Sequence, residues 1–172
     1  MTAHVRLARP DEVIACQDVE RRAAAVFAST PYPHLVDAPP TDACVLRAAI
    51  AEGLQWIGID SRDETQLAGQ LTAAVDADSM LIAQVDVVPH AQRQGLGRAL
   101  IGAAETEARR RGLSSLWLRT FRDIPWNAPF YASLGFQPEA ATENDVGEHG
   151  VAQERDLGLN PATRVTMRKL LV

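Results

Sequence analysis

One segment constrains the fold more than any other: an alternating run of apolar residues, a turn with two glycines and a long amphipathic stretch follow one another. The alternation over Met80–Val88 predicts a strand. Gln84 and Asp86 are expected on one face of it, and the opposite face would carry Leu81, Ala83, Val85 and Val87. Pro89 ends the strand. Gly95–Arg111 then has the periodicity of a helix.

Gly95 and Gly97 stand at the start of this helix, where glycine costs roughly 1 kcal/mol relative to alanine. Such a turn leaves backbone N–H groups unpaired, and with the helix dipole they form a site for an anion such as phosphate. Arg93 and Arg98 would add positive charge. A turn whose glycines serve only tight geometry is the alternative. The spacing matches neither GxGxxG nor a P-loop, so Rossmann dinucleotide binding and nucleotide hydrolysis are not indicated.

The rest of the chain supplies further strands and helices in the order βααβββαβαβ. Strands are expected at His4–Ala8, Leu54–Asp60, Gln66–Val75, Leu116–Phe121 and Arg164–Leu170. Helices are expected at Asp11–Phe27, at Asp42–Glu52 with Thr41 as its cap, and directly after Asn127. This order has too few crossovers for a doubly wound sheet. We therefore expect an α+β fold, with a mixed, mostly antiparallel central sheet flanked by helices, in a single domain over residues 1–172.

Composition narrows the class of partner. The chain has 17 basic and 22 acidic residues and a formal charge of −5, which argues against a nucleic-acid surface and mildly favours cationic amines. Cys16 and Cys44 have no CxxC spacing and no nearby pair of histidines, so neither a disulfide framework nor a metal site is indicated. No apolar run approaches the roughly 18 residues of a membrane span. We expect a cytoplasmic protein with no membrane partner.

Several motifs together carry a resemblance to a known family. Val87-Val88-Pro89 is followed by Gln92-x-x-Gly95-x-Gly97, a long helix, the strand Leu116-Trp117-Leu118, and "NAPFYASLGF" over Asn127–Phe136. In this combination the chain resembles the GNAT superfamily of acyl-CoA-dependent N-acetyltransferases, and a bacterial subgroup of it. The resemblance is strongest over Met80–Pro138. It implies the GNAT acyl-CoA N-acyltransferase fold, with acetyl-CoA as co-substrate.

The resemblance also implies roles for individual residues. The cofactor pyrophosphate would lie on the turn formed by Gln92, Arg93, Gln94, Gly95, Leu96, Gly97 and Arg98. The pantetheine arm would pair with the backbone of Val87 and Val88, one of whose N–H groups would polarise the thioester carbonyl. Tyr131 matches the tyrosine that donates a proton to the departing CoA thiolate. The alternative for Tyr131 is a core aromatic residue beside Phe130 and Phe136.

Two positions depart from the family pattern. Ile124 stands where many relatives carry an asparagine that contacts the cofactor. Asn127 either takes over that contact or only caps the following helix. Arg119 stands where some peptide-acetylating relatives carry a basic glutamate, and an arginine cannot accept a proton.

The sequence therefore leaves three candidates for the general base: two carboxylates and a chain of water molecules. Glu20 falls near the apolar stripe of the first predicted helix, where partial burial would favour a proton-accepting role. It is alternatively a rim glutamate paired with Arg21 or Arg22. Asp86 lies beside the end of the predicted strand, and is alternatively a solvated residue on a polar face.

Two functions of different classes follow. The first is acetyl transfer from acetyl-CoA to a primary amine of a small molecule or peptide, by direct attack in a ternary complex, because neither cysteine has a paired histidine. The second is a non-catalytic acyl-CoA-binding or sensing domain that acts through a partner. The departures at Arg119 and Ile124 favour the sensor, and Tyr131 favours the enzyme. The acceptor stays unidentified, and a homodimer is one arrangement that the sequence leaves open.

Overall fold

The described residues form a seven-stranded sheet with helices on both of its faces. The computed structural model describes residues 4–60, 62–63, 66–139, 154 and 156–171. Across the sheet the order is β1-β2-β3-β4-β5-β7-β6, and neighbours pair antiparallel except β4 and β5. The strands are β1 (His4–Leu7), β2 (Gln55–Ile59), β3 (Leu67–Asp76), β4 (Ser79–Val87), β5 (Ser115–Phe121), β6 (Gln137–Glu139) and β7 (Arg164–Leu170). The expected mixed, mostly antiparallel sheet is confirmed, and β6 is a strand that the sequence did not indicate.

Four α-helices are present in the described part of the chain: α1 (Val13–Ala23), α2 (Ala43–Ala51), α3 (Leu96–Arg110) and α4 (Ala128–Ala132). α1 is shorter than expected because 3-10 turns replace both ends, η1 (Pro10–Glu12) and η2 (Ala24–Ser29). The prediction that Thr41 caps α2 is wrong. Asp42 holds that position, and its Oδ1 accepts a hydrogen bond from the N–H of Cys44 at 2.6 Å.

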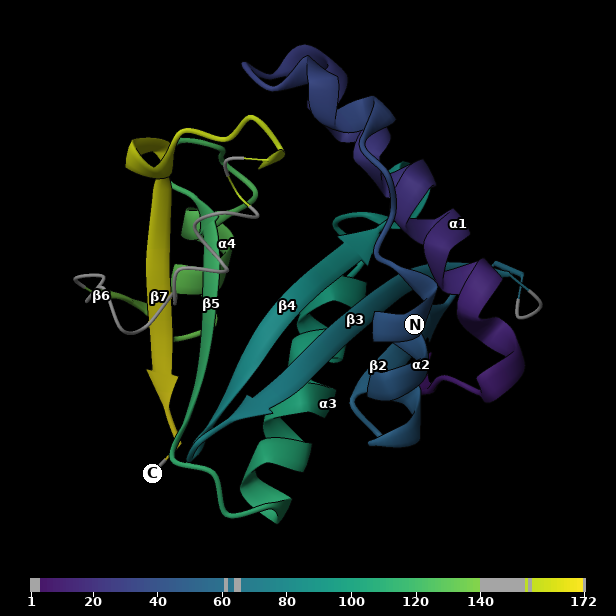
Figure 1. The fold of residues 1–172 in the computed structure, drawn as a ribbon, viewed down its shortest axis with the longest axis vertical. Helices are drawn as coiled ribbons and strands as arrows, with labels where there is room; N and C mark the ends of the chain where they lie inside the picture. Colours follow the sequence, from purple (N-terminus) through teal and green to yellow (C-terminus); the bar gives the residue numbers. More distant parts are fainter. Residues whose placement is uncertain (1–3, 61, 64–65, 140–153, 155, 172) are drawn as a thin grey trace.

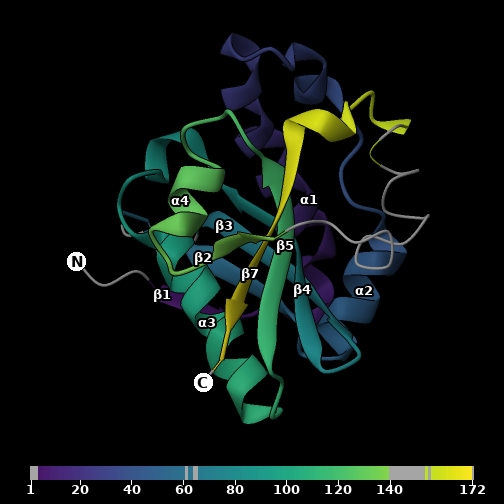
Figure 2. The same cartoon turned by 90° about the vertical axis from the view of Figure 1, so that its left-hand side faces the viewer.

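Different helices cover the two faces of the sheet. α3 packs so closely on one face that a Cβ on Gly58 would lie 2.6 Å from the Leu96 side chain. Gln55 points to the other face, because its Nε2 donates to Sγ of Cys16 on α1 at 3.7 Å. Figure 2 shows α3 and α4 on one side of the sheet and α1 and α2 on the other.

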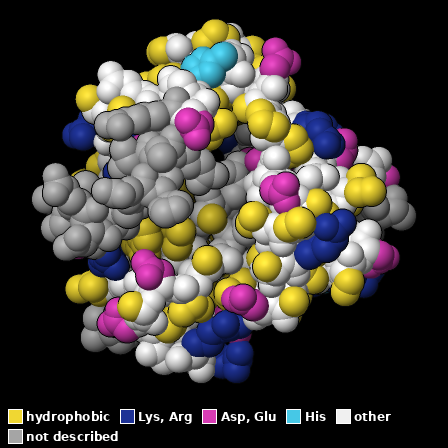
Figure 3. All heavy atoms as spheres, in the orientation of Figure 1, with side chains coloured by type: hydrophobic (Ala, Val, Ile, Leu, Met, Phe, Trp, Pro, Cys, Tyr) yellow, Lys and Arg dark blue, Asp and Glu magenta, His cyan; other side chains and the backbone are white. Residues whose placement is uncertain are grey.

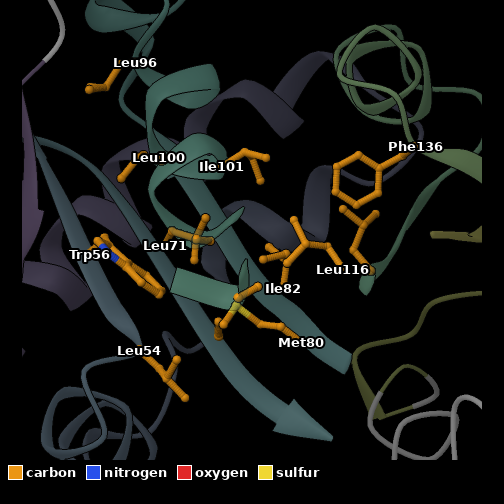
Figure 4. Packing of buried hydrophobic residues seen from close by; sticks show 14 of the residues in the cluster. Leu54, Trp56, Leu71, Met80, Ile82, Leu96, Leu100, Ile101, Leu116 and Phe136 are labelled. Atoms are coloured by element: carbon orange, nitrogen blue, oxygen red, sulfur yellow. The ribbon is translucent and has the colours of Figure 1, made fainter. Parts of the chain in front are cut away.

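The main hydrophobic core lies between the sheet and α3 (Figure 4). Large side chains of α3 pack there against residues of β2, β3, β4, β5 and β7 and against Phe136, which follows α4. The fully buried members include Leu54, Leu71, Met80, Leu100, Ile101, Leu116, Leu118 and Phe136. Burial of apolar area on this scale is the main source of stability, at roughly 25 cal/mol for each Å² removed from water. It also anchors α3, whose first turn carries the two glycines.

β4 and β5 pair only at their first residues and then separate. The parallel register runs from Ser79 opposite Ser115 to Leu81 opposite Trp117 and stops there. Figure 1 shows the two strands diverging beyond that point. The register of β4 against β3 shifts at Ala83, which is an extra residue between Ile82 and Gln84. Such a bulge bends a strand and increases its twist, which turns β4 away from β5.

The bulge also corrects the predicted faces of β4. Leu81 does not share a face with Val85 and Val87, because the extra residue at Ala83 breaks the alternation. The second half of the prediction is confirmed: Asp86 pairs with Gln70 of β3 and lies on the face opposite Val85 and Val87, toward α1. None of the helices in the described ranges is both long and apolar enough to cross a membrane.

Candidate active site

The C-terminal half of β4 presents an open backbone edge toward β5. Val88 donates its N–H to the carbonyl of Ala68 at 2.9 Å, so it belongs to the ladder with β3. Because ladder bonds alternate along an antiparallel strand, Val87 directs its N–H and C=O the other way, toward the gap. The Gln92 side chain donates to the Val87 carbonyl at 3.0 Å. Of the two expected amides, only that of Val87 faces the gap.

The glycine turn holds a row of unpaired backbone donors. Gly95 has a φ of 85°, a left-handed conformation that glycine adopts without a steric penalty, and it directly precedes α3. The first intrahelical bond runs from Ala99 N–H to the Gly95 carbonyl at 3.0 Å. For residues 93–98, no backbone N–H has an acceptor in the part of the chain that the structure describes. Six consecutive amides without acceptors at a helix start are an arrangement that can bind an anion.

Several side chains of this turn contact the protein itself. The amide of Gln94 donates to the carbonyl of His90 at 2.8 Å, as Gln92 does to Val87. Leu96 is buried against the sheet, so only its backbone faces the turn. Arg93 and Arg98 are exposed and leave two guanidinium groups beside the free amides.

Tyr131 lies on α4 with its ring packed and its hydroxyl unpaired. The centroid of the ring lies 5.2 Å from that of Phe130 and 5.8 Å from that of Phe136. The ring itself is therefore packed as a core aromatic residue, as the alternative interpretation had it. The hydroxyl has no hydrogen-bond partner among the described residues. Every fully buried side-chain nitrogen or oxygen of those residues has a partner, so this hydroxyl reaches accessible space. Burial raises the pKa of Tyr131 above its usual value, and the negative charge of Asp86 raises it further.

Asp86 sits in a polar network on the α1 face of the sheet. Its carboxylate accepts hydrogen bonds from Gln70 at 2.9 Å and from Gln84 at 3.0 Å. Gln70 in turn accepts from Gln55, which also accepts from Thr72 at 2.7 Å. Burial raises the pKa of Asp86 to about 7, with a further rise from the charge of Glu20, although both glutamine hydrogen bonds oppose it. This is not the solvated carboxylate of the alternative interpretation, although part of its surface stays accessible.

Glu20 lies close enough to Asp86 to influence its charge, but it is engaged elsewhere. One carboxylate oxygen accepts from the N–H of Thr41 at 2.9 Å and the other from its hydroxyl at 3.2 Å. The alternative pairing with Arg21 or Arg22 is wrong, since Arg22 pairs with Asp18 instead. Thr41, predicted as a helix cap, therefore fastens the loop before α2 to the end of α1.

A buried group of three charges lies on the other side of the gap: Arg119 on β5, Arg164 on β7, and Glu154, which pairs with both arginines. Arg119 forms a two-pronged ion pair with Glu154, at 2.8 Å from Nε and 2.9 Å from Nη2. Arg164 Nε reaches the same carboxylate at 3.1 Å, and its guanidinium lies 4.5 Å from the Phe121 ring centroid. Burial opposes ionisation of Glu154, but the two arginines hold its pKa below the usual value. Nothing in the sequence indicated this group, because Glu154 falls in a polar stretch without periodicity.

Tyr131 lies between the two sides. The charge of Asp86 on β4 raises the pKa of the phenol and the charge of Arg164 on β7 lowers it, so both groups are within electrostatic reach of Tyr131. The surface is hollowed near the middle of this face, beside the C-terminal half of β4 (Figure 3). The structure thus brings together Asp86, Glu20 and Tyr131, three residues proposed from the sequence, and adds Arg119, Arg164 and Glu154.

The structure bears on the two roles considered for Asn127, a contact with the cofactor and the cap of α4. It occupies the N-cap position of α4, but its side chain makes no capping hydrogen bond. The cap interpretation therefore holds for its place in the chain and not for its side chain. Ile124 is buried in a small cluster with Phe121 and Leu159. Among the described residues there is no cluster of three or more histidine, cysteine or acidic side chains that would hold a metal ion.

Comparison with known proteins settles the family. Residues 23–136 match the model of the Acetyltransferase (GNAT) family, which is most of the chain. The chain belongs to the GNAT acetyltransferase family. Acetyl-CoA is the co-substrate of this family. The resemblance stated from the motifs and the expected GNAT fold are both confirmed.

The individual proteins that this chain is similar to share less than a third of its residues in the matched regions. The [ribosomal protein bS18]-alanine N-acetyltransferase of Escherichia coli is 29% identical over 93 residues, which cover 54% of this chain and 63% of that protein. The PaiA N-acetyltransferase of Thermoplasma acidophilum, solved with coenzyme A, superposes with a TM-score of 0.71 at 16% identity, over 99% and 100% of the two chains. The E. coli ribosomal-protein-S18-alanine N-acetyltransferase structure has a TM-score of 0.67 at 20% identity, over 98% and 94%. At these identities the structures establish the fold.

Proposed function

We propose that this protein transfers the acetyl group of acetyl-CoA to a primary amine by direct attack in a ternary complex. The observation that carries the proposal is the Tyr131 hydroxyl, which is unpaired, reaches accessible space and lies within electrostatic reach of Asp86. A phenol in that position serves as an acid, whereas binding alone has no use for it.

The residues of the turn and of β4 fit the co-substrate. The six unpaired amides of residues 93–98, with Arg93 and Arg98 beside them, would hold the pyrophosphate. The open edge at Val87 would pair with the pantetheine arm as an added strand does. The unbonded side chain of Asn127 would add a polar contact. Bound there, the co-substrate supplies an acetyl group activated as a thioester.

The N–H of Val87 would act on the reacting carbonyl. A donor fixed in a folded backbone costs no reorganisation when negative charge develops on the carbonyl oxygen. Removal of one such donor typically costs 10²–10³-fold in rate, which is the scale of effect assigned here. Val88 does not share this role, because Ala68 accepts its N–H.

Proton transfers are assigned to Tyr131 and Asp86. The acceptor arrives as an ammonium ion and must lose a proton before its nitrogen attacks the carbonyl carbon. With its pKa near 7, Asp86 is partly ionised at neutral pH and accepts that proton. As the bond to sulfur breaks, Tyr131 donates its hydroxyl proton to the thiolate. Glu20, held by Thr41, would act through its charge on Asp86 rather than as the base.

A covalent acyl-cysteine is not part of the proposal. Cys16 is buried under α1, where burial raises the pKa of its thiol to about 11. Cys44 is exposed on α2, and no acid or base pairs with its thiol among the described residues. Neither sulfur is an activated nucleophile.

The test follows release of CoA thiol from acetyl-CoA with a panel of amines that includes peptide N-termini. Tyr131→Phe should lower kcat by about 10²–10⁴-fold and leave acetyl-CoA binding within about threefold. Tyr32→Phe is the matched control, because the Tyr32 ring packs on Phe121 at 4.3 Å and only its hydroxyl is removed. Full activity of Tyr131→Phe would refute the acid role. Tight acetyl-CoA binding without turnover of any amine would instead favour the acyl-CoA-sensing domain.

A further inference from the structure

Arg119, Arg164 and Glu154 carry a charge that the described part of the fold does not balance. Two guanidinium groups share one carboxylate, so the group has a net charge of +1. The side chains are 12%, 13% and 10% exposed respectively. Burying an uncompensated charge is costly, and such a charge is normally met by a partner of opposite sign.

One arginine nitrogen is left over. Arg119 uses Nε and Nη2 on Glu154 and Nη1 on the hydroxyl of Thr166 at 3.1 Å. Arg164 uses Nε on Glu154 and Nη2 on the carbonyl of Arg119 at 3.2 Å. Its Nη1 donates to no other described residue, and it is not fully buried, because every fully buried side-chain nitrogen there has a partner. An unpaired guanidinium N–H therefore faces accessible space.

Arg164 is on β7 and Asp86, the proposed base, is on β4, so the two residues lie on opposite sides of the gap between β4 and β5. Tyr131 is near both groups, since the positive charge of Arg164 lowers the pKa of its phenol and the negative charge of Asp86 raises it. The proposed attack needs the acceptor nitrogen near Asp86 and near the thioester. An acceptor placed there has negative charge on one side, from Asp86 and from the nearby charge of Glu20, and the guanidinium of Arg164 on the other.

We propose that the acceptor is an amino acid, whose free carboxylate binds Arg164 while its amine faces Asp86. This rests on the proposed acetyl transfer and narrows its substrate class. A guanidinium group matches a carboxylate in shape and charge. The Phe121 ring stacks against the guanidinium of Arg164 and holds it in position. Polyamines, which the net charge of −5 mildly favours, would bring a second cation toward the arginines. A peptide amine presents a neutral amide where an amino acid presents its carboxylate.

The experiment compares each amino acid with its own carboxamide, for example L-alanine with L-alaninamide, under acetyl-CoA-dependent thiol release. We expect kcat/KM to be about 10–100-fold higher for the free acid, the range of a charged hydrogen bond. Arg164→Gln should remove that preference, mainly through KM for the acid, and leave the carboxamide within about threefold. Arg164→Lys should retain part of the preference, because it keeps the charge.

Controls separate this inference from the proposed function and from misfolding. Arg47→Gln removes an exposed arginine on α2 and should leave the preference for the acid unchanged. Arg164→Gln keeps the two-pronged pair of Arg119 with Glu154, and its carboxamide activity reports an intact fold. Equal or better use of carboxamides by the wild type overturns the amino-acid assignment alone. So does an equal loss for acid and carboxamide in Arg164→Gln. No turnover of any amine overturns the proposed function itself.

Discussion

Replacement of Asp86 by asparagine should stabilise the fold and impair catalysis together. The carboxylate accepts hydrogen bonds from Gln70 and Gln84, and an amide has the same shape. The amide oxygen can keep the bond from Gln70. Gln84 makes no other side-chain hydrogen bond among the described residues, so it can rotate its terminal amide and accept from the new NH₂ group. Asp86→Asn thus removes a charge and keeps the contacts.

The size of the expected stabilisation follows from the difference between the pKa of Asp86 in the folded protein and in the unfolded chain. Burial raises this pKa from 3.8 to about 7 in the folded protein. Between those pH values the unfolded chain has lost a proton that the folded protein retains, so wild-type stability falls by about 1.4 kcal/mol per pH unit as pH rises. The full loss would be about 4 kcal/mol. Solvent reaches part of the side chain, so we expect the variant to be about 2 kcal/mol more stable above pH 7.

The assay is urea denaturation of both proteins from pH 4 to pH 9. The stability difference should be near its minimum at pH 4, grow up to pH 7 and stay constant above it. Asp76→Asn, which removes an exposed carboxylate on β3, is the control for the loss of one negative charge without burial. At pH 7.5 the kcat/KM of Asp86→Asn should fall by about 10²–10⁴-fold. Parallel stability curves, or an undiminished kcat/KM, would refute the reasoning.

Three further predictions concern other parts of the molecule. Gly97→Asp should raise the acetyl-CoA Kd at least about tenfold by calorimetry, through a like charge beside the pyrophosphate; Gly97→Ala separates charge from bulk, and equal affinities would place the cofactor elsewhere. Glu154→Gln leaves two buried arginines without a carboxylate and should cost about 3–5 kcal/mol in urea denaturation; a cost below about 1 kcal/mol would contradict the buried group. Iodoacetamide at pH 8 should alkylate Cys44 and spare Cys16 in the native protein, because burial raises the pKa of the Cys16 thiol to about 11; mass spectrometry showing two adducts would contradict this.

The positions of the elements were predictable because the signals for them are local. Alternation and helical periodicity depend on neighbours within a few residues, and they placed most strands and helices within a residue or two. The left-handed conformation of Gly95 is likewise a property of its own backbone. One error was local as well, because Asp42 took the cap position of α2 from its neighbour Thr41. The reversed faces of the first half of β4 depend instead on the bulge at Ala83, which is defined by pairing with β3.

By itself, then, the sequence determined the strands of the sheet, the glycine turn before α3 and the family motifs, because each of these depends on residues that are close together in the chain. Only the tertiary structure decided which charges meet. Asp86, Tyr131 and Arg164 come from β4, α4 and β7, and whether a carboxylate is solvated or buried depends on what packs around it. The bulge that opens β4 from β5, and Glu154 between two arginines, lie in that same category. Desolvation and Coulomb interactions act through space, and the order of residues along a chain does not state those distances.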